Sequence, residues 1–243
     1  MNLKGNGAIV TGGGSGIGRS IAISLAAEGC KVVVAGRRQE YLRETAQLWA
    51  GRPQILNFPV DVADRENVKK LFIWAEEQLG SIDILVNSAG INIQNRTMAD
   101  VIPEDWDRVL AINATGTFNC IHSVVGKMRE RGEGLIINIS SVAGKRASTL
   151  GGISYNASKF AMTALGTTVG LEEMKNGIRV TNIYPGEVDT PILEKRPLPV
   201  TNEHRSRMLK AEDVAAAVLM VARLPNRAHV PELVIKPTYQ DYV

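Results

Sequence analysis

The first 36 residues combine a glycine-rich loop with two short apolar runs and one helical pattern. The first run is AIV at residues 8–10, and TGGGSGIG follows at once at residues 11–18. Apolar residues then recur at helical spacing as far as Gly29, and the second run covers residues 31–35. This order is typical of a strand–helix–strand unit of about thirty residues. Glycines at the junction permit a tight turn and a close approach to phosphates, which the free N–H groups of the helix attract.

The rest of the chain keeps the same alternation of short apolar runs and amphipathic stretches. Residues 68–79, for example, place apolar side chains at the 3.6-residue helical period. Such alternation predicts an α/β fold, a Rossmann-like doubly wound parallel sheet with helices on both faces, and 243 residues are expected to form a single domain. We expect seven strands, near residues 6–10, 31–35, 54–59, 82–86, 134–139, 178–184 and 232–236.

Composition argues against several other classes of protein. The net charge is +3 without a long basic run, which argues against nucleic acid as the main partner. The longest apolar run, residues 214–222, is too short to cross a membrane, and residues 1–10 lack the apolar core of a signal peptide. Cys30 and Cys120 lie among apolar residues and are expected to be reduced core thiols of a cytoplasmic protein. The three histidines lack the spacing of metal ligands, so we expect no catalytic metal.

Tyr155 and Lys159 form a candidate proton-transfer pair at the head of a helical stretch. Residues four apart on a helix share one face. A phenol has an ordinary pKa of about 10, and a neighbouring ammonium favours the phenolate. We therefore expect Lys159 to lower the pKa of Tyr155, which would let the phenol exchange a proton with an alcohol or a carbonyl oxygen.

The end of the second apolar run, AGRR at residues 35–38, indicates which dinucleotide the glycine loop would bind. An acid at this place binds the ribose 2′-hydroxyl of NAD, whereas an arginine suits the 2′-phosphate of NADP. No acid is present, and a guanidinium binds phosphate through two parallel hydrogen bonds. Arg37 and Arg38 therefore predict NADP(H) over NAD(H), unless both merely belong to a solvated turn.

These motifs together resemble the short-chain dehydrogenase/reductase family over nearly the whole chain. Residues 11–18 fit the family loop TGxxxGxG, the tyrosine and lysine fit YxxxK, and NSAG at residues 87–90 is similar to NNAG. The resemblance implies that Asn113, Ser141, Tyr155 and Lys159 are catalytic; Ser140 is the less favoured serine because Ser141 precedes Val-x-Gly. It also implies cofactor contacts from Gly12, Ser15, Gly16, Ile17, Gly18, Arg37, Arg38, Asp61, Val62, Asn87, Ala89, Gly90, Tyr155, Lys159, Pro185, Gly186, Val188 and Thr190.

Three departures from the family pattern stand out. Ser141 lies fourteen residues before Tyr155, where thirteen is usual, so one residue is added near Gly151-Gly152. The usual Asp-Gly-Gly near the carboxyl end is replaced by VIKP at residues 234–237. Glu187 places an unexpected acid near the expected site of the nicotinamide amide. None of the three removes a catalytic group.

The resemblance implies an oxidoreductase that interconverts a secondary alcohol or hydroxy acid and the carbonyl compound by hydride transfer. Tyr155 would exchange the proton, Ser141 would bind the substrate oxygen, Lys159 the nicotinamide ribose, and Asn113 a water beside Lys159. Residues 189–210 are the expected substrate lid, and residues 190–210 hold five basic against two acidic side chains, which suits an anionic substrate or simply a solvated loop.

Two alternative functions remain open at this stage. One is a 3-oxoacyl-[acyl-carrier-protein] reductase, and the other is a non-catalytic NADP-binding sensor or scaffold. The resemblance also implies a homo-oligomer, a tetramer or dimer, formed through helices near residues 105–130 and 154–175.

Overall fold

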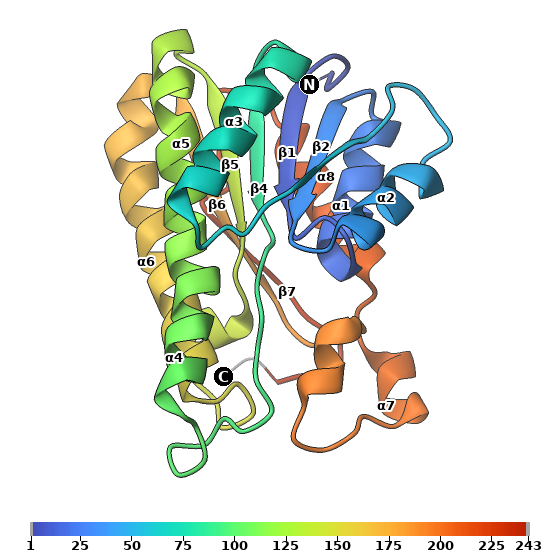
Figure 1. Ribbon diagram of the computed structural model, residues 1–243, viewed down its shortest axis with the longest axis vertical. Helices are drawn as coiled ribbons and strands as arrows, with labels where there is room; N and C mark the ends of the chain where they lie inside the picture. Colours follow the sequence, from blue (N-terminus) through green and yellow to red (C-terminus); the bar gives the residue numbers. More distant parts are fainter. Residues whose placement is uncertain (1, 242–243) are drawn as a thin grey trace.

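The protein is described by a computed structural model that covers residues 2–241. Its centre is one parallel sheet of seven strands in the order β3-β2-β1-β4-β5-β6-β7 (Figure 1). Each predicted strand is confirmed, with both ends within two residues of the expected ones. The strands are β1 Gly7–Thr11, β2 Lys31–Gly36, β3 Leu56–Pro59, β4 Ile84–Asn87, β5 Gly134–Ile139, β6 Ile178–Pro185 and β7 Glu232–Ile235.

Helices cover both faces of the sheet, as the alternation predicts. Side chains alternate along β1, so Ala8 and Val10 pack with α1 (Gly16–Ala27) and α8 (Ala211–Ala222), whereas Ile9 packs with α3 (Arg65–Leu79) and α5 (Gly116–Arg131) on the opposite face. The five apolar positions expected between residues 68 and 79 are all buried. The helices are α1 Gly16–Ala27, α2 Gln39–Leu48, α3 Arg65–Leu79, α4 Pro103–Leu110, α5 Gly116–Arg131, α6 Ile153–Glu173, α7 Asn202–Arg207 and α8 Ala211–Ala222.

The strand order reverses between β1 and β4, and this reversal places the site. Connections from β1 run outward to β2 and β3, and those from β4 run the other way to β5, β6 and β7. In open α/β sheets ligands bind beyond the carboxyl ends of the strands at such a point. The loops after β1, β4, β5 and β6 meet there, and the orange segment that contains α7 lies at the same end of the sheet (Figure 1).

The remaining sequence predictions on the class of protein concern membranes, thiols and metals. None of the helices within residues 2–241 is long and apolar enough to cross a membrane. Cys30 and Cys120 are buried and unpaired, as expected, and burial raises the pKa of both thiols to about 12. In the described part of the chain, no three His, Cys, Asp or Glu side chains gather as metal ligands would.

Candidate active site

A cavity of about 550 Å³ lies at the carboxyl ends of the strands and is lined by residues from the segments that follow all seven of them. The sequence-predicted residues that line it are Gly12, Ser15, Gly16, Ile17, Gly18, Arg37, Arg38, Asp61, Val62, Ala89, Gly90, Ser141, Tyr155, Lys159, Pro185, Gly186, Val188 and Thr190. Two predicted residues, Asn87 and Asn113, lie behind the lining and are fully buried.

The glycine loop between β1 and α1 has the shape of a phosphate cradle. Gly12 has φ +65°, and a Cβ there would lie 2.8 Å from the backbone nitrogen of Ala89. A Cβ on Gly18 would collide with the carbonyl oxygen of Gly12. Ser15 precedes α1 without capping it through its side chain, so the first N–H groups of the helix remain available to an anion. The residues present therefore fit the diphosphate of a dinucleotide.

The far end of the cavity fits an adenosine group. Arg37 and Arg38 follow β2 and are exposed, and the guanidinium of Arg38 lies 4.0 Å from the centre of the Tyr41 ring. Opposite them Asp61 and Val62 follow β3, where Oδ1 of Asp61 accepts a hydrogen bond from the backbone N–H of Ala63 at 3.0 Å. The lining thus combines two cations with the side chains of Tyr41 and Val62, and β2 ends without an acid.

The catalytic candidates meet at the other end of the cavity. Tyr155 and Lys159 lie on the first turns of α6, and the ammonium of Lys159 is 5.7 Å from the centre of the Tyr155 ring. Lys159 Nζ donates to the carbonyl oxygen of Ile139 at 2.8 Å, at the end of β5. Ser141 lies close enough to the Tyr155 phenol to lower its pKa as a hydrogen-bonding partner.

The structure separates the two serines at the end of β5. Ser140 is buried, and its hydroxyl contacts the carbonyl oxygen of Lys159 at 3.3 Å and Oγ1 of Thr163 at 3.2 Å, so it is turned toward α6. Ser141 precedes a short 3-10 helix, Val142–Gly144, and its oxygen accepts from the N–H of Ala143 at 3.1 Å. Its hydroxyl proton remains free to be donated beside the phenol, and the choice of Ser141 as the catalytic serine stays a prediction.

The pKa values of Tyr155 and Lys159 differ from the expectation. Burial raises the pKa of the Tyr155 phenol, against the opposing effects of the Ser141 hydrogen bond and the positive charge of Arg96. Lys159 is only 4% exposed, and this burial lowers the pKa of its ammonium to about 7. The expectation that Lys159 lowers the pKa of Tyr155 is therefore wrong here, because the lysine is buried so deeply that its own charge is disfavoured.

Asn113 and Asn87 hold the walls of the cavity together. Asn113 lies in a π-helical turn, Ala111–Thr115, between α4 and α5. Its side chain accepts from the N–H of Ile91 at 2.8 Å and donates to the carbonyl oxygen of the same residue at 3.0 Å. Nδ2 of Asn87 donates to Oδ1 of Asn138 at 2.9 Å across neighbouring strands. Asn113 thus braces the loop after β4 from behind, and Asn87 joins the end of β4 to β5.

Sequence reasoning missed several residues of the cavity, and the charged one that is buried among them is Arg96. It lies in the loop after β4, is 5% exposed, and donates through Nη1 to the carbonyl oxygen of Leu150 at 2.8 Å and through Nη2 to that of Lys195. Both partners are more than fifty residues away in the sequence. A single arginine in a stretch without periodicity carries no signal of such burial.

The expected lid, residues 189–210, forms two short helices rather than an irregular loop: a 3-10 helix, Pro191–Lys195, and α7. Residues 190–196 line the cavity, and the lining does not extend to residues 197–210. Glu187 ties the segment down, since it accepts hydrogen bonds from Arg196 at 2.7 Å, His204 at 2.9 Å and Tyr239 at 2.6 Å. Burial by itself would raise the pKa of Glu187, but these hydrogen bonds hold it at about 2.

Replacing Glu187 with glutamine should loosen this segment. A neutral amide weakens the bonds to Arg196 and His204, and charge-assisted hydrogen bonds contribute about 1.5–3 kcal/mol each. Amide hydrogen exchange over residues 190–207 should therefore become about 10- to 100-fold faster. The control is Glu203→Gln, an exposed acid of the same segment. Equal exchange in the wild type and Glu187→Gln would show that Glu187 does not hold the lid.

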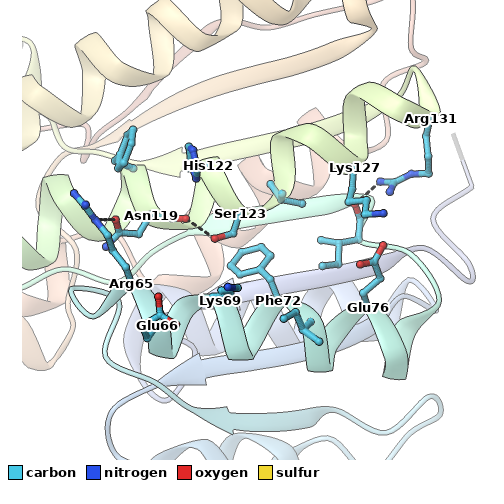
Figure 2. A pocket seen from close by; sticks show the side chains of 14 residues that line it. Arg65, Glu66, Lys69, Phe72, Glu76, Asn119, His122, Ser123, Lys127 and Arg131 are labelled. Carbon is cyan, nitrogen blue, oxygen red and sulfur yellow. Dashed lines mark hydrogen bonds between the residues drawn. The ribbon is translucent and has the colours of Figure 1, made fainter.

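A second hollow, of about 610 Å³, lies between α3 and α5 (Figure 2). None of the predicted site residues lines it. Its labelled side chains include Arg65, whose Nε donates to Oδ1 of Asn119 at 3.3 Å, and the charged residues Lys69, Glu76 and Lys127 (Figure 2). It shares no lining residue with the first cavity.

Comparison with known proteins agrees with this geometry. Residues 6–199 match the family described as short chain dehydrogenase. A Staphylococcus saprophyticus protein named as an uncharacterized oxidoreductase is 38% identical over 245 residues, which cover 98% of this chain and 99% of that protein.

Two solved structures show the same fold with a nicotinamide cofactor present. A serine dehydrogenase complexed with NADP+ has a TM-score of 0.89 and 29% identity over 97% of this chain and 96% of its own. A 3-ketoacyl-(acyl-carrier-protein) reductase from Brucella melitensis complexed with NADH has a TM-score of 0.85 and 26% identity over 96% of this chain and 98% of its own. With the sequence match over most of its length and the site just described, this chain belongs to the short-chain dehydrogenase/reductase family of oxidoreductases.

Proposed function

We propose that the protein is an NADP(H)-dependent oxidoreductase that interconverts a secondary alcohol or hydroxy acid and the corresponding carbonyl compound. The observation that carries this proposal is the meeting of Ser141 and the Tyr155 phenol in the cavity that also contains the glycine cradle. The screen that tests it follows absorbance of NADPH while a panel of ketones, aldehydes and oxo acids is added. Cofactor binding without turnover of any compound would favour the sensor or scaffold, which the complete set of catalytic residues argues against.

The chemistry at the substrate oxygen follows from the two hydroxyl groups. The nicotinamide, when bound, supplies or accepts the hydride. Ser141 and Tyr155 bind the carbonyl oxygen, and Tyr155 gives it a proton during reduction and takes the proton back during oxidation. Because burial raises the pKa of Tyr155, the phenol is protonated at neutral pH, which is the form that reduction needs. Positioned proton transfer of this kind is worth about 10²–10⁴-fold in rate.

Lys159 and the loops hold the cofactor in this proposal. The ammonium reaches the cavity beside Gly90, where a Cβ would lie 3.6 Å from Nζ, and from there it would bind the ribose hydroxyls. Backbone around Gly186 and Val188 would bind the amide of the nicotinamide. The side-chain amide of Asn113 binds both the N–H and the carbonyl oxygen of Ile91 in the loop after β4, and it would thereby keep the neighbouring Gly90 in place.

The preference for NADP(H) rests on Arg37 and Arg38. Both are exposed at the end of β2, so a 2′-phosphate bound there would lie beside two positive charges. We expect kcat/KM to be about 10- to 100-fold higher with NADPH than with NADH, since charge-assisted hydrogen bonds contribute about 1.5–3 kcal/mol each.

The double variant Arg37→Ala/Arg38→Ala should lose most of this preference, because it weakens the binding of NADPH and leaves the binding of NADH unchanged. The control is Arg43→Ala, which removes a cation from α2 outside the cavity lining. A wild-type protein that prefers NADH would refute the assignment of cofactor.

One alternative function, reduction of 3-oxoacyl groups on acyl carrier protein, is supported by the likeness to the Brucella melitensis reductase. The lid bases do not favour it, because Glu187 pairs with Arg196 and Asp189 pairs with Arg205 and Lys210. Comparing kcat/KM for carrier-linked and free 3-oxoacyl compounds separates the two functions.

A homo-oligomer is also part of the proposal, as a tetramer or dimer. Large apolar side chains are exposed on α4, on α5 and along α6 with the turn after it: Trp106, Phe118, Phe160, Leu171 and Met174. Contiguous exposed apolar surface is typical of an interaction site. Light scattering should give a mass of two or four chains; a monomer would contradict it. The two free thiols fit a cytoplasmic location.

A further inference from the structure

Arg96 is a buried cation without an anionic partner. Two of its nitrogens donate to backbone carbonyl oxygens, those of Leu150 and Lys195, but the buried Nε has no hydrogen-bond partner among residues 2–241. No ion pair between described residues includes Arg96. A guanidinium cannot lose its proton in a protein, so it cannot avoid the cost of burial by becoming neutral.

The chain makes room for this guanidinium beside the catalytic phenol. Arg96 lines the same cavity as Tyr155 and Ser141, and its positive charge lowers the pKa of Tyr155 against the larger effect of burial. Gly152 has φ +79°, and a Cβ there would lie 2.7 Å from Cγ of Arg96. The residue that lengthens the spacing between Ser141 and Tyr155 therefore belongs to the loop against which the arginine packs.

The lid cations do not offer an equivalent site. Arg196 is paired with Glu187 at 2.7 Å, and Arg205 and Lys210 share Asp189 at 3.0 and 2.9 Å. The basic excess of this segment is thus largely neutralised within the protein. Lys159 is assigned to the cofactor ribose and Lys195 is exposed, so Arg96 is the buried arginine at the catalytic end of the cavity that has no anion beside it.

We propose that the guanidinium of Arg96, which lines the cavity, binds a carboxylate of the substrate, while Ser141 and Tyr155 bind the oxygen that is reduced or oxidised. The substrate is then an oxo acid and the product a hydroxy acid, or the reverse. This proposal rests on the proposed oxidoreductase function and names its substrate class. The hydride goes to the carbonyl carbon and the proton of Tyr155 to its oxygen, so the carboxylate keeps its charge throughout.

The test compares carboxylates with neutral analogues of the same shape. The 2-, 3- and 4-oxo acids are each compared with their own methyl esters, and kcat/KM is measured for every compound with NADPH. We expect the wild type to prefer the acids. Arg96→Met should lower kcat/KM for the best acid roughly 30- to 1,000-fold, because losing one partner of a buried charge pair is that costly. It should change kcat/KM for the ester by less than about threefold, and Arg96→Lys should restore part of the preference.

Arg205→Met is the matched control, since it removes a lid cation that does not line the cavity. A loss of equal size for acid and ester in Arg96→Met would show that Arg96 only braces Leu150 and Lys195, and would overturn the proposal. Calorimetry with oxo acids and no reduced cofactor tests carboxylate binding by Arg96 separately from the oxidoreductase function. Carboxylate binding that disappears in Arg96→Met supports the site even if no compound is turned over, and binding that persists in the variant refutes it.

Discussion

Replacing Tyr155 with phenylalanine should reduce kcat/KM by about 10³-fold or more while the Kd for NADPH stays within about threefold of the wild type. In the proposed mechanism the phenol is the acid that protonates the substrate oxygen, and its hydroxyl is also one of the two that bind this oxygen. The phenylalanine ring keeps the apolar packing on α6. The loss should therefore appear in the chemical step, which single-turnover kinetics with saturating NADPH would isolate.

The matched control for this variant is Tyr184→Phe. Tyr184 is fully buried on β6 and gives its hydroxyl to Glu232 at 2.8 Å, outside the cavity lining. Its loss should lower stability by about 1 kcal/mol and leave kcat near the wild-type value. Near-normal turnover by Tyr155→Phe would remove Tyr155 from the mechanism.

Replacing Lys159 with methionine should abolish turnover and at the same time stabilise the folded protein at neutral pH. Lys159 is 4% exposed, and its ammonium donates to Ile139 and lies 3.8 Å from the Met162 sulfur. Burial lowers its pKa to about 7, so folding at neutral pH includes the cost of burying a partly charged group. Methionine has a similar length without the charge. We expect a gain of about 2 kcal/mol and a rise in Tm of about 4–8 °C.

The pH dependence of this gain has a definite direction. The folded-state pKa of Lys159 is about 7, below its value of about 10.4 in the unfolded chain. Between these values the unfolded state binds more protons, so the wild type gains stability as pH rises through this window. The advantage of Lys159→Met should thus be largest at pH 7 and below and should shrink toward pH 10.

Lys145→Met provides the control for Lys159→Met. Lys145 pairs with Glu232 near the surface, and its loss should not raise Tm. A Lys159→Met variant that is less stable than the wild type at pH 6–7 would contradict the account of the buried ammonium.

Local patterns were enough to predict the sheet and the glycine loop, and the family resemblance added other residues that line the cavity. Periodicity identified Val68, Leu71 and Phe72 as core positions, and they pack on the sheet because a 3.6-residue apolar repeat leaves a helix one face to bury. The glycine loop could be identified because only glycine tolerates φ +65° at Gly12 with Ala89 so close.

What could not be predicted depends on contacts between distant parts of the chain. Arg96 is buried by Leu150 and Lys195, which the topology brings together and the sequence keeps far apart. The raised pKa of Tyr155 reflects how deeply the pair is buried, and spacing on a helix carries no information about depth. Glu187 appeared as an anomaly until its partners His204 and Tyr239 were seen to converge on it.

The most direct test of the central claim, hydride transfer at Ser141 and Tyr155, is the fate of the hydride itself. The protein is incubated with NADPH that carries deuterium at the transferable position and with the panel of oxo acids and esters, and the products are analysed by mass spectrometry. We expect one deuterium on the carbinol carbon of at least one product with the wild type and none with Tyr155→Phe over the same time. Deuterium that stays on the cofactor for every compound, or a product formed equally by Tyr155→Phe, would contradict the claim.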